Sequence, residues 1–282
     1  SRGRRTWRPP PTSHAASEVA EWRLFRGWTD EELRRRLERL DTVERNFTLE
    51  EIGPETGWRY YYSRAVVSRS EPGPPRPGGA FDVGRDAVAS YAFSDPRIVT
   101  VHLDPSRPLL GRRMLLEIKI FGLHYLSGVV VGDVLSKDVE GRTLFGFRYD
   151  TLEGHIERGF EWFILAKDHE TGEIFFRIQA VWKPGQFPNW WSRLGFHLFA
   201  LRYQRAWHRL AHVRLRTLIG SEGLTPLPRP SQMLHFGPEL PGPGIWEMSP
   251  EYLAPPAVRP AEESEGRERR HPAERDVEPG AA

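Results

Sequence analysis

The stretch that decides the fold is residues 173–220, EIFFRIQAVWKPGQFPNWWSRLGFHLFALRYQRAWHRLAHVRLRTLIG. Its first part alternates as a half-buried strand does, with Ile174, Phe176, Ile178, Ala180 and Trp182 on one face. The Lys183-Pro184-Gly185 tripeptide cannot continue a strand ladder, so the chain turns there. This pattern predicts an amphipathic strand that ends at a bend.

A long helix is predicted after the bend. Asn189 is a candidate N-cap, the helical pattern runs from Trp190 to Ile219, and Gly220 ends it. Thirty helical residues span roughly 45 Å, enough to cross a whole domain. We therefore expect this helix to lie against the strands that precede it.

Basic residues recur along this helix at spacings of three and four and form one stripe: Arg202, Arg205, Arg209, His212 and Arg216. From Ile174 to Ser221 there is no acidic residue, against eight Arg or Lys. One interpretation is a solvated face whose cations suit the helix C-terminus. Another is a surface for anionic headgroups or nucleic acid. We expect the stripe to pair with acids elsewhere, for example Glu31, Glu32, Glu38 and Glu44.

Composition bounds the class of protein. The 282 residues include 40 basic and 38 acidic groups, a formal net charge of +2, and no cysteine. Disulfides, thiolate metal sites and a cysteine nucleophile are therefore excluded. No apolar run approaches the roughly 20 residues of a membrane span, so a cytoplasmic protein is expected. The 25 Pro and 26 Gly suggest unstructured ends.

The chain divides into three predicted parts. Residues 1–20 are expected to be a disordered basic arm, residues 21–220 one domain, and residues 221–282 a Pro-rich, mostly disordered tail. Thr29 and Glu32 form a capping-box pattern before a helix over 31–40. A strand is predicted over 58–67 and a helix over 81–93. Further strands are predicted near 97–103, 113–121, 124–137, 142–150, 158–167 and 173–183. Their short connections indicate an antiparallel sheet, and helices at the two ends of the strand run indicate an α+β fold whose last helix covers one face of the sheet. The family resemblance described below implies that the sheet wraps around this long C-terminal helix.

The densest polar cluster is residues 146–161, GFRYDTLEGHIERGFE. His155 and Glu157 could form an acid–base couple, and together with Glu161 they could bind a metal. Neither arrangement has a specific ligand spacing. The alternative is that Thr151, His155 and Glu157 satisfy backbone groups between two strands. We predict no catalytic residue, no metal site and no cofactor.

This cluster, continued to Phe163, resembles the signature of the uncharacterised domain-of-unknown-function family numbered nineteen-ninety, roughly GF-x-YGTL-x-GH-x-ERGEE-x-F. The matching residues are Gly146, Phe147, Tyr149, Thr151, Leu152, Gly154, His155, Glu157, Arg158, Gly159 and Phe163. The chain departs from the signature at Asp150, Glu153, Ile156 and Phe160. The family is similar to the START-like (SRPBCC) helix-grip superfamily, whose members mostly hold apolar or amphipathic molecules between sheet and helix.

The resemblance implies non-catalytic binding of a small apolar or amphipathic, lipid-like ligand between the sheet and the last helix. The expected wall residues are Phe145, Phe147, Trp162, Trp182, Phe199, Tyr203 and Trp207. The expected polar anchors are Tyr149, Thr151, His155 and Glu157. Two alternatives remain open: an enzyme acting on a small apolar substrate in the same pocket, and an anionic-surface or nucleic-acid binder using the Arg-rich last helix. Nucleic acid is not an expected partner, and the sequence carries no signal for an oligomeric state.

Overall fold

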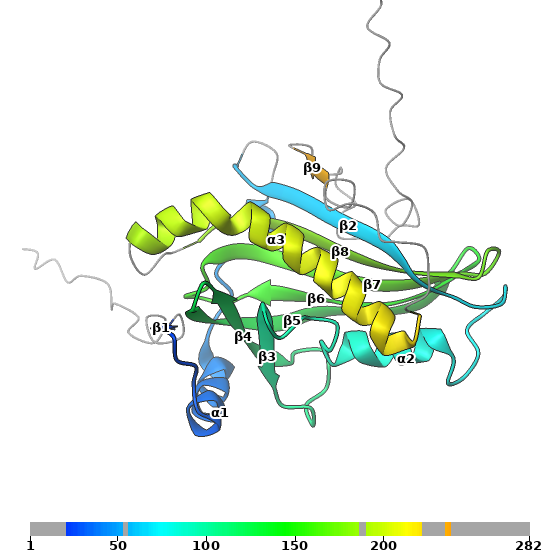
Figure 1. Ribbon diagram of the computed structural model, residues 1–282, viewed down its shortest axis with the longest axis horizontal. Coiled ribbons are helices and arrows are strands. Elements are labelled where there is room, and N and C mark those ends of the chain that lie inside the picture. The colour runs from blue at the N-terminus through cyan, green and yellow to red at the C-terminus, as the bar shows by residue number, and fades with distance from the viewer. Residues whose placement is uncertain (1–20, 53–55, 186–189, 222–234, 238–282) are drawn as a thin grey trace, which may run out of the picture.

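A computed structural model describes residues 21–52, 56–185, 190–221 and 235–237 of the chain (Figure 1). The predicted arm, residues 1–20, lies outside the described residues, as does the predicted tail except for Ser221 and residues 235–237. The helices are α1 (Asp30–Arg39), α2 (Ala80–Ala89) and α3 (Trp190–Ile219), with short 3₁₀ turns at Leu40–Thr42 and Leu49–Glu51.

The described strands form one nine-stranded sheet. They are β1 (Glu21–Leu24), β2 (Arg59–Arg69), β3 (Val99–Leu103), β4 (Arg113–Ile120), β5 (Leu123–Val139), β6 (Arg142–Thr151), β7 (Glu157–Asp168), β8 (Glu173–Pro184) and β9 (His235–Gly237). Their order is β3-β4-β5-β6-β7-β8-β2-β9, and β1 pairs with β5 beside this path. Every pairing is antiparallel. The predicted α+β fold with an antiparallel sheet is therefore confirmed.

The predicted signals at element ends are present in the structure. The Thr29 side chain accepts a hydrogen bond from the Glu32 N–H, and Glu32 bonds back to the Thr29 N–H, so the capping box is formed. Gly220 adopts φ +73°, the left-handed conformation that ends α3. The predicted N-cap Asn189 lies outside the described residues.

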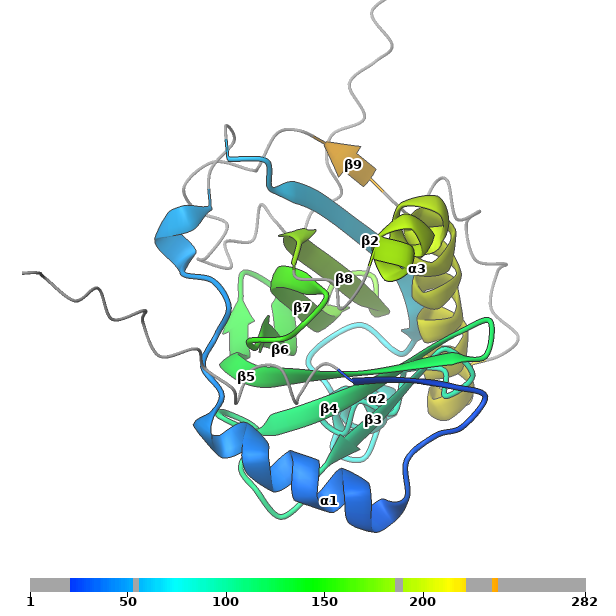
Figure 2. The same cartoon turned by 90° about the vertical axis from the view of Figure 1, so that its left-hand side faces the viewer.

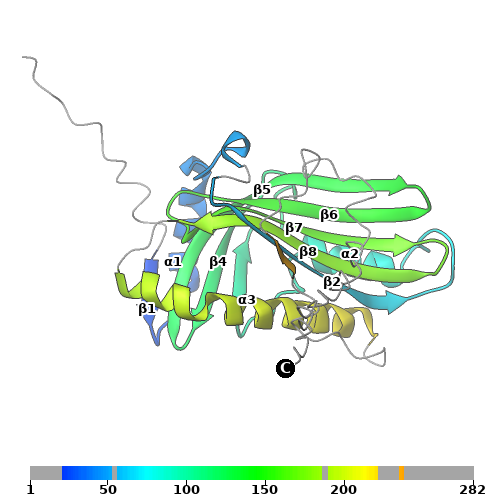
Figure 3. The same ribbon diagram turned by 90° about the horizontal axis from the view of Figure 1, so that it is seen from above.

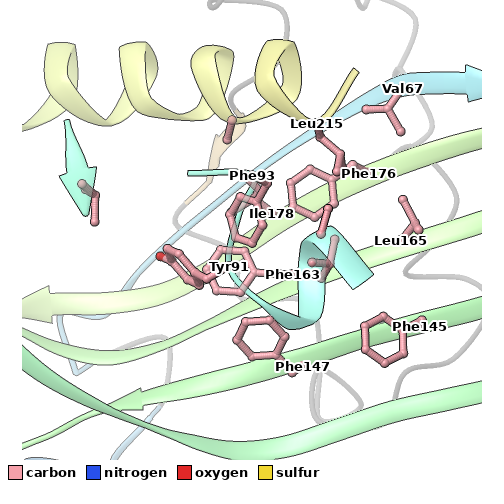
Figure 4. Packing of buried hydrophobic residues seen from close by; sticks show 14 of the residues in the cluster. Val67, Tyr91, Phe93, Phe145, Phe147, Phe163, Leu165, Phe176, Ile178 and Leu215 are labelled. Carbon is pink, nitrogen blue, oxygen red and sulfur yellow. The ribbon is translucent and has the colours of Figure 1, made fainter. Parts of the chain in front are cut away.

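Helix α3 lies along one face of the sheet, which we call the inner face (Figures 1 and 3). From α3, Trp207, Ala211 and Leu215 belong to the same buried cluster as Phe163 and Phe176 of the sheet. The space between sheet and helix is filled further by the segment after α2. Figure 4 shows its Tyr91 and Phe93 among the sheet phenylalanines, and the ring centroids of Phe93 and Phe163 are 4.9 Å apart. The interior of the fold is thus largely occupied by its own aromatic side chains.

The basic stripe of α3 is not one solvated row. His212 is fully buried, and the Arg216 guanidinium, also buried, donates to the Val66 carbonyl at 2.6 Å. Arg202, Arg205 and Arg209 are exposed. Within the described ranges, the acids of α1 contact arginines close to them and not the stripe: Glu31 contacts Arg34 and Arg35, Glu32 contacts Arg23, and Glu38 contacts Arg34. The packed side of the helix thus buries two members of the stripe.

Candidate functional site

Strand register gives the inner face an apolar centre and one polar end. Phe145, Phe147 and Tyr149 of β6 stand opposite Leu165, Phe163 and Glu161 of β7. The next row, on β8, is apolar, with Ile178 opposite Phe163 and Ala180 opposite Glu161. The face therefore becomes polar where β6 ends and β7 begins.

A small hollow lies at this polar end. Its lining residues come from the ends of β6, β7 and β8: Tyr149, Thr151, Glu157, Gly159, Phe160, Glu161, Ala180 and Trp182. The space available to the centre of a water molecule is about 10 Å³, which is room for about one water. We take this hollow as the candidate site.

Glu161 is the buried carboxylate of the site. The Tyr149 hydroxyl donates to Glu161 Oε2 at 2.6 Å. Tyr149 also shares a hydrogen bond with Tyr91, and burial, followed by the negative charge of Glu161, raises the pKa of Tyr91 well above its usual value. Two phenols and one carboxylate thus form a connected polar group beside the aromatic core.

Glu157 is the second carboxyl group of the hollow, and it is half-buried. Burial raises its pKa to about 7, and the hydrogen bond that Gln204 donates from α3, at 3.3 Å, opposes this only in part. A carboxyl group with this pKa can accept or donate a hydrogen bond near neutral pH.

Gly159 separates the two acids along β7. Its φ is +142°, and a Cβ at this position would lie 2.0 Å from the Val181 carbonyl oxygen. No side chain larger than hydrogen fits there without moving β8. Strand β8 can therefore pack here only if residue 159 is glycine, and the hollow lies beside this glycine.

Two of the expected anchors satisfy polar groups of the fold. The Thr151 hydroxyl accepts from the Gly159 N–H at 2.9 Å and donates to Asn46 Oδ1 at 2.7 Å. His155 is buried, and its Nδ1 accepts from the Glu157 N–H at 3.0 Å. Burial lowers the pKa of His155 to about 4, so the imidazole is neutral at pH 7. The imidazole thus bonds to the Glu157 backbone and not to its carboxyl group.

The expected wall residues are only partly brought together. Trp182 lines the hollow, whereas Phe145 and Phe147 are packed in the aromatic centre. The expectation for Trp162 is wrong, because it alternates with Phe163 and lies in the cluster on the opposite, outer face. That position fell inside a continuous apolar run, which leaves the face ambiguous in the sequence.

The wall residues expected on α3 meet the segment that follows α2. Tyr203 donates to the Ile98 carbonyl at 3.3 Å, and Trp207 Nε1 donates to Ser94 Oγ at 3.1 Å. The Phe199 side chain lies outside the described residues. A segment inserted between sheet and helix, with no periodic signature of its own, thus takes the place expected for a ligand.

Several lining residues were not among the predicted site residues, namely Gly159, Phe160, Glu161 and Ala180. One signal was available for Glu161. Glu161 is two and four residues before Phe163 and Leu165 on the same strand, so it lies on the same, core-facing side. Gln204, which contacts Glu157, carries no comparable signal.

A second polar cluster lies between β2 and α3. Ser63 Oγ is 2.5 Å from His208 Nδ1 and 3.0 Å from His212 Nε2, and all three side chains are buried. Burial lowers the pKa of His212 to about 3 and that of His208 well below its usual value. A fully enclosed serine between two neutral imidazoles joins helix to sheet.

Neither cluster offers a metal site. Across the described ranges, no group of three or more His, Cys, Asp or Glu side chains could hold a metal ion. Among the helices within those ranges, none is both long enough and apolar enough to cross a membrane.

A family model described as "Domain of unknown function (DUF1990)" matches residues 42–213. The chain belongs to this family. The match contains the hollow and most of α3, so the candidate site lies within the DUF1990 region. No curated protein matches the chain.

Solved structures similar to the chain are distant in sequence. The crystal structure of Ara h 8.0201 is 12% identical, with a TM-score of 0.34, and the match covers 58% of this chain and 99% of that one. A hypothetical protein from Helicobacter pylori is 9% identical, with a TM-score of 0.36, over 62% of this chain and 95% of that one. An uncharacterized protein from Rhizobium leguminosarum is 14% identical, with a TM-score of 0.28, over 58% and 97%.

Proposed function

We propose that this protein binds a small amphipathic molecule at the end of the inner face, with a hydrogen-bond-donating head group held by Glu161 and Glu157. The observation that carries the proposal is the placement of Glu161. Its side chain is only 5% exposed, stands in an apolar row and lines the hollow. A carboxylate beside a hollow can accept a hydrogen bond from a bound head group.

The surroundings of Glu161 define the chemistry of the ligand. Tyr149 donates to one carboxylate oxygen, and Glu157 supplies a second carboxyl group across Gly159. Two acids favour a hydroxyl or ammonium head group over an anionic one. Trp182 and Ala180 offer apolar contact beside the acids. Because the hollow holds about one water, only the head group enters it, and the apolar remainder lies outside.

Isothermal titration of the full chain with dodecylamine, dodecanol and dodecanoate, each below its micellar concentration, tests the proposal. We expect the amine and the alcohol to bind and the carboxylate not to bind. Glu161→Gln should weaken amine binding by roughly ten-fold or more, because a neutral amide replaces the charge partner. The matched control is Glu170→Gln, an exposed acid in the β7–β8 turn, which should leave binding unchanged. Equal binding of dodecanoate, or equal loss in both variants, contradicts the proposal.

One observation favours a second function at the same place, that of an enzyme acting on a small apolar substrate. A carboxyl group with a pKa of about 7 beside a hollow suits general acid–base catalysis near neutral pH. His155 is not its partner in the structure, because Nδ1 is bonded to backbone. Turnover of an ester or lactone that is abolished by Glu157→Gln, with the fold intact, would favour the enzyme.

A further inference from the structure

Exposed hydrophobic side chains gather at one place in the fold, which we call the aromatic tip: Trp22, Leu24, Phe25 and Phe121. Their exposed fractions are 44%, 52%, 79% and 79%. Trp22 and Leu24 are two residues apart on β1 and so share one face, and Phe25 follows directly. Phe121 is in the turn between β4 and β5, whose first residues pair with β1.

The backbone of the aromatic tip holds both phenylalanines outward. Phe25 and Phe121 have φ of +56° and +48°, a conformation that bulky residues rarely adopt. The Phe25 N–H donates to the Gly122 carbonyl at 2.7 Å, which ties the two loops together. A Cβ at Gly122 would lie 2.5 Å from the Phe25 ring, so the ring rests against this glycine. Strain of this kind persists only where surrounding contacts impose it.

One arginine supplies an exposed positive charge at the aromatic tip. Arg26 is exposed next to Phe25. The acids of the neighbouring strands are engaged, since Glu21 contacts Arg36 at 2.6 Å and Glu117 contacts His124 at 2.7 Å. Helix α3 begins at the same end of the molecule, as Figures 2 and 3 show, and contains no acidic residue over its 30 positions.

Strand β5 connects the aromatic tip to the end of the sheet that holds the candidate site. Strand β5 pairs with β1 through Leu126 and with the end of β6 from Val129. Trp22 pairs with Tyr125, four residues before Val129, and Phe25 bonds to Gly122, seven residues before it, so the strand path is about 13 to 23 Å long. Residues Tyr149 and Thr151 of the hollow are at that end of β6. The aromatic tip and the hollow are therefore joined by one strand but are not adjacent.

We infer that the aromatic tip docks on an anionic phospholipid bilayer. Exposed phenylalanines and a tryptophan beside a basic residue are features by which proteins insert into a headgroup region. The four side chains of the aromatic tip are few for a stable protein interface, which buries about 800 Å² on each partner. The inference goes beyond the proposed ligand binding and does not depend on it, because docking involves the vesicle alone.

Vesicle flotation of the full chain tests the inference, using phosphatidylcholine vesicles with and without phosphatidylserine. We expect binding to the mixed vesicles, weakened by salt and by omission of phosphatidylserine. The double variant Phe25→Asn/Phe121→Asn removes both rings, and asparagine tolerates positive φ. It should bind roughly ten-fold more weakly or worse, because the buried apolar area is lost.

The matched control is Leu110→Asn, which removes another exposed hydrophobic side chain, 61% exposed, from the β3–β4 connection. This variant should bind as the unaltered protein does. Circular dichroism that matches for all three proteins shows that each is folded. The inference is overturned if the unaltered protein does not float with mixed vesicles, or if the control loses binding equally. It is also overturned if the double variant only converts a dimer to a monomer in light scattering.

Discussion

Surroundings, not residue type, decide the protonation of the acids in this protein. Burial raises the pKa of Glu157 to about 7, at the end of the inner face. On the outer face, Glu117 accepts hydrogen bonds from His102 and His124, at 3.3 and 2.7 Å, and these contacts lower its pKa to about 2. The two glutamates therefore differ in charge near neutral pH, and Glu157 changes its charge in that range.

Replacing Glu157 by glutamine should change the pH dependence of stability. A pKa raised from 4.5 to about 7 means that the folded state binds a proton more tightly than the unfolded state. This contribution is fully present below pH 4.5 and is lost as pH rises through 7. Glu157→Gln should therefore be more stable than the unaltered protein at pH 8, by about 1–3 kcal/mol, and little different at pH 4.

Urea denaturation of both proteins at the two pH values measures this difference. The pKa of His155, lowered to about 4, gives the opposite slope between pH 4 and 6.5, but it does so in both proteins and cancels. Glu170→Gln is the control, since its exposed carboxyl should give no such pattern. A gain in stability of the same size at pH 4 and pH 8 would refute the assignment.

Asp150 shows how the chain accommodates a departure from the family signature. The signature commonly has glycine here, whereas the Asp150 carboxylate is 1% exposed. It contacts Arg148 at 2.7 Å and Arg45 at 2.8 Å, and its atoms fill the space above Gly132. A buried carboxylate is tolerated because two guanidinium groups and a facing glycine accompany it.

At the scale of elements, α3 is attached to the sheet by buried polar contacts as well as by packing. Ser63 of β2 bonds both His208 and His212, and Arg216 donates to the Val66 carbonyl. These groups stand on the helix face that meets β2. They fix the rotation of the helix, because a turn about its axis would leave them buried without partners.

Ser63→Ala should destabilise the protein by about 1–3 kcal/mol, because two buried imidazole nitrogens lose their hydrogen-bond partner. The free energy of unfolding in urea at pH 8, where both histidines are neutral, measures the loss. Ser70→Ala, at an exposed serine just after β2, is the control and should change stability by about 0.5 kcal/mol or less. Equal effects of the two substitutions would show that the Ser63 contacts contribute nothing.

Most elements could be predicted from the sequence because each long element has its own periodicity. The bounds of β8 and α3 follow from alternation and from Gly220. Strands β1 and β9 have only four and three residues, too few for an alternating pattern to appear. They are strands because they pair with β5 and β2. The site was less predictable, because the position of Tyr91 and Phe93 inside the fold is a tertiary property.

At the scale of the whole molecule, the sheet is buried on both faces. The inner cluster contains Phe147, Phe163 and Phe176, and the outer clusters contain Trp162 and Leu115. Alternate residues of the same strands belong to different clusters, so neither face can lose its packing without disturbing the other. That residues 21–220 form one domain stays a prediction.

One cooperative unfolding transition is therefore expected. Far-UV circular dichroism, near-UV circular dichroism and tryptophan fluorescence should give the same urea midpoint. The ten tryptophans include Trp28 near α1 and Trp207 on α3, so fluorescence reports on both ends of the fold. An early fluorescence change with unaltered far-UV signal would contradict the single-domain prediction.

Strand β9 has a consequence for how copies of this protein meet one another. Residues His235–Gly237 pair with Tyr60–Tyr62, at the margin of the sheet. An uncovered margin offers unpaired amide and carbonyl groups on which another chain can add a strand, and aromatic residues favour such addition. Residues 235–237 thus pair with the backbone of three consecutive tyrosines, a strand segment that would otherwise be open to aggregation.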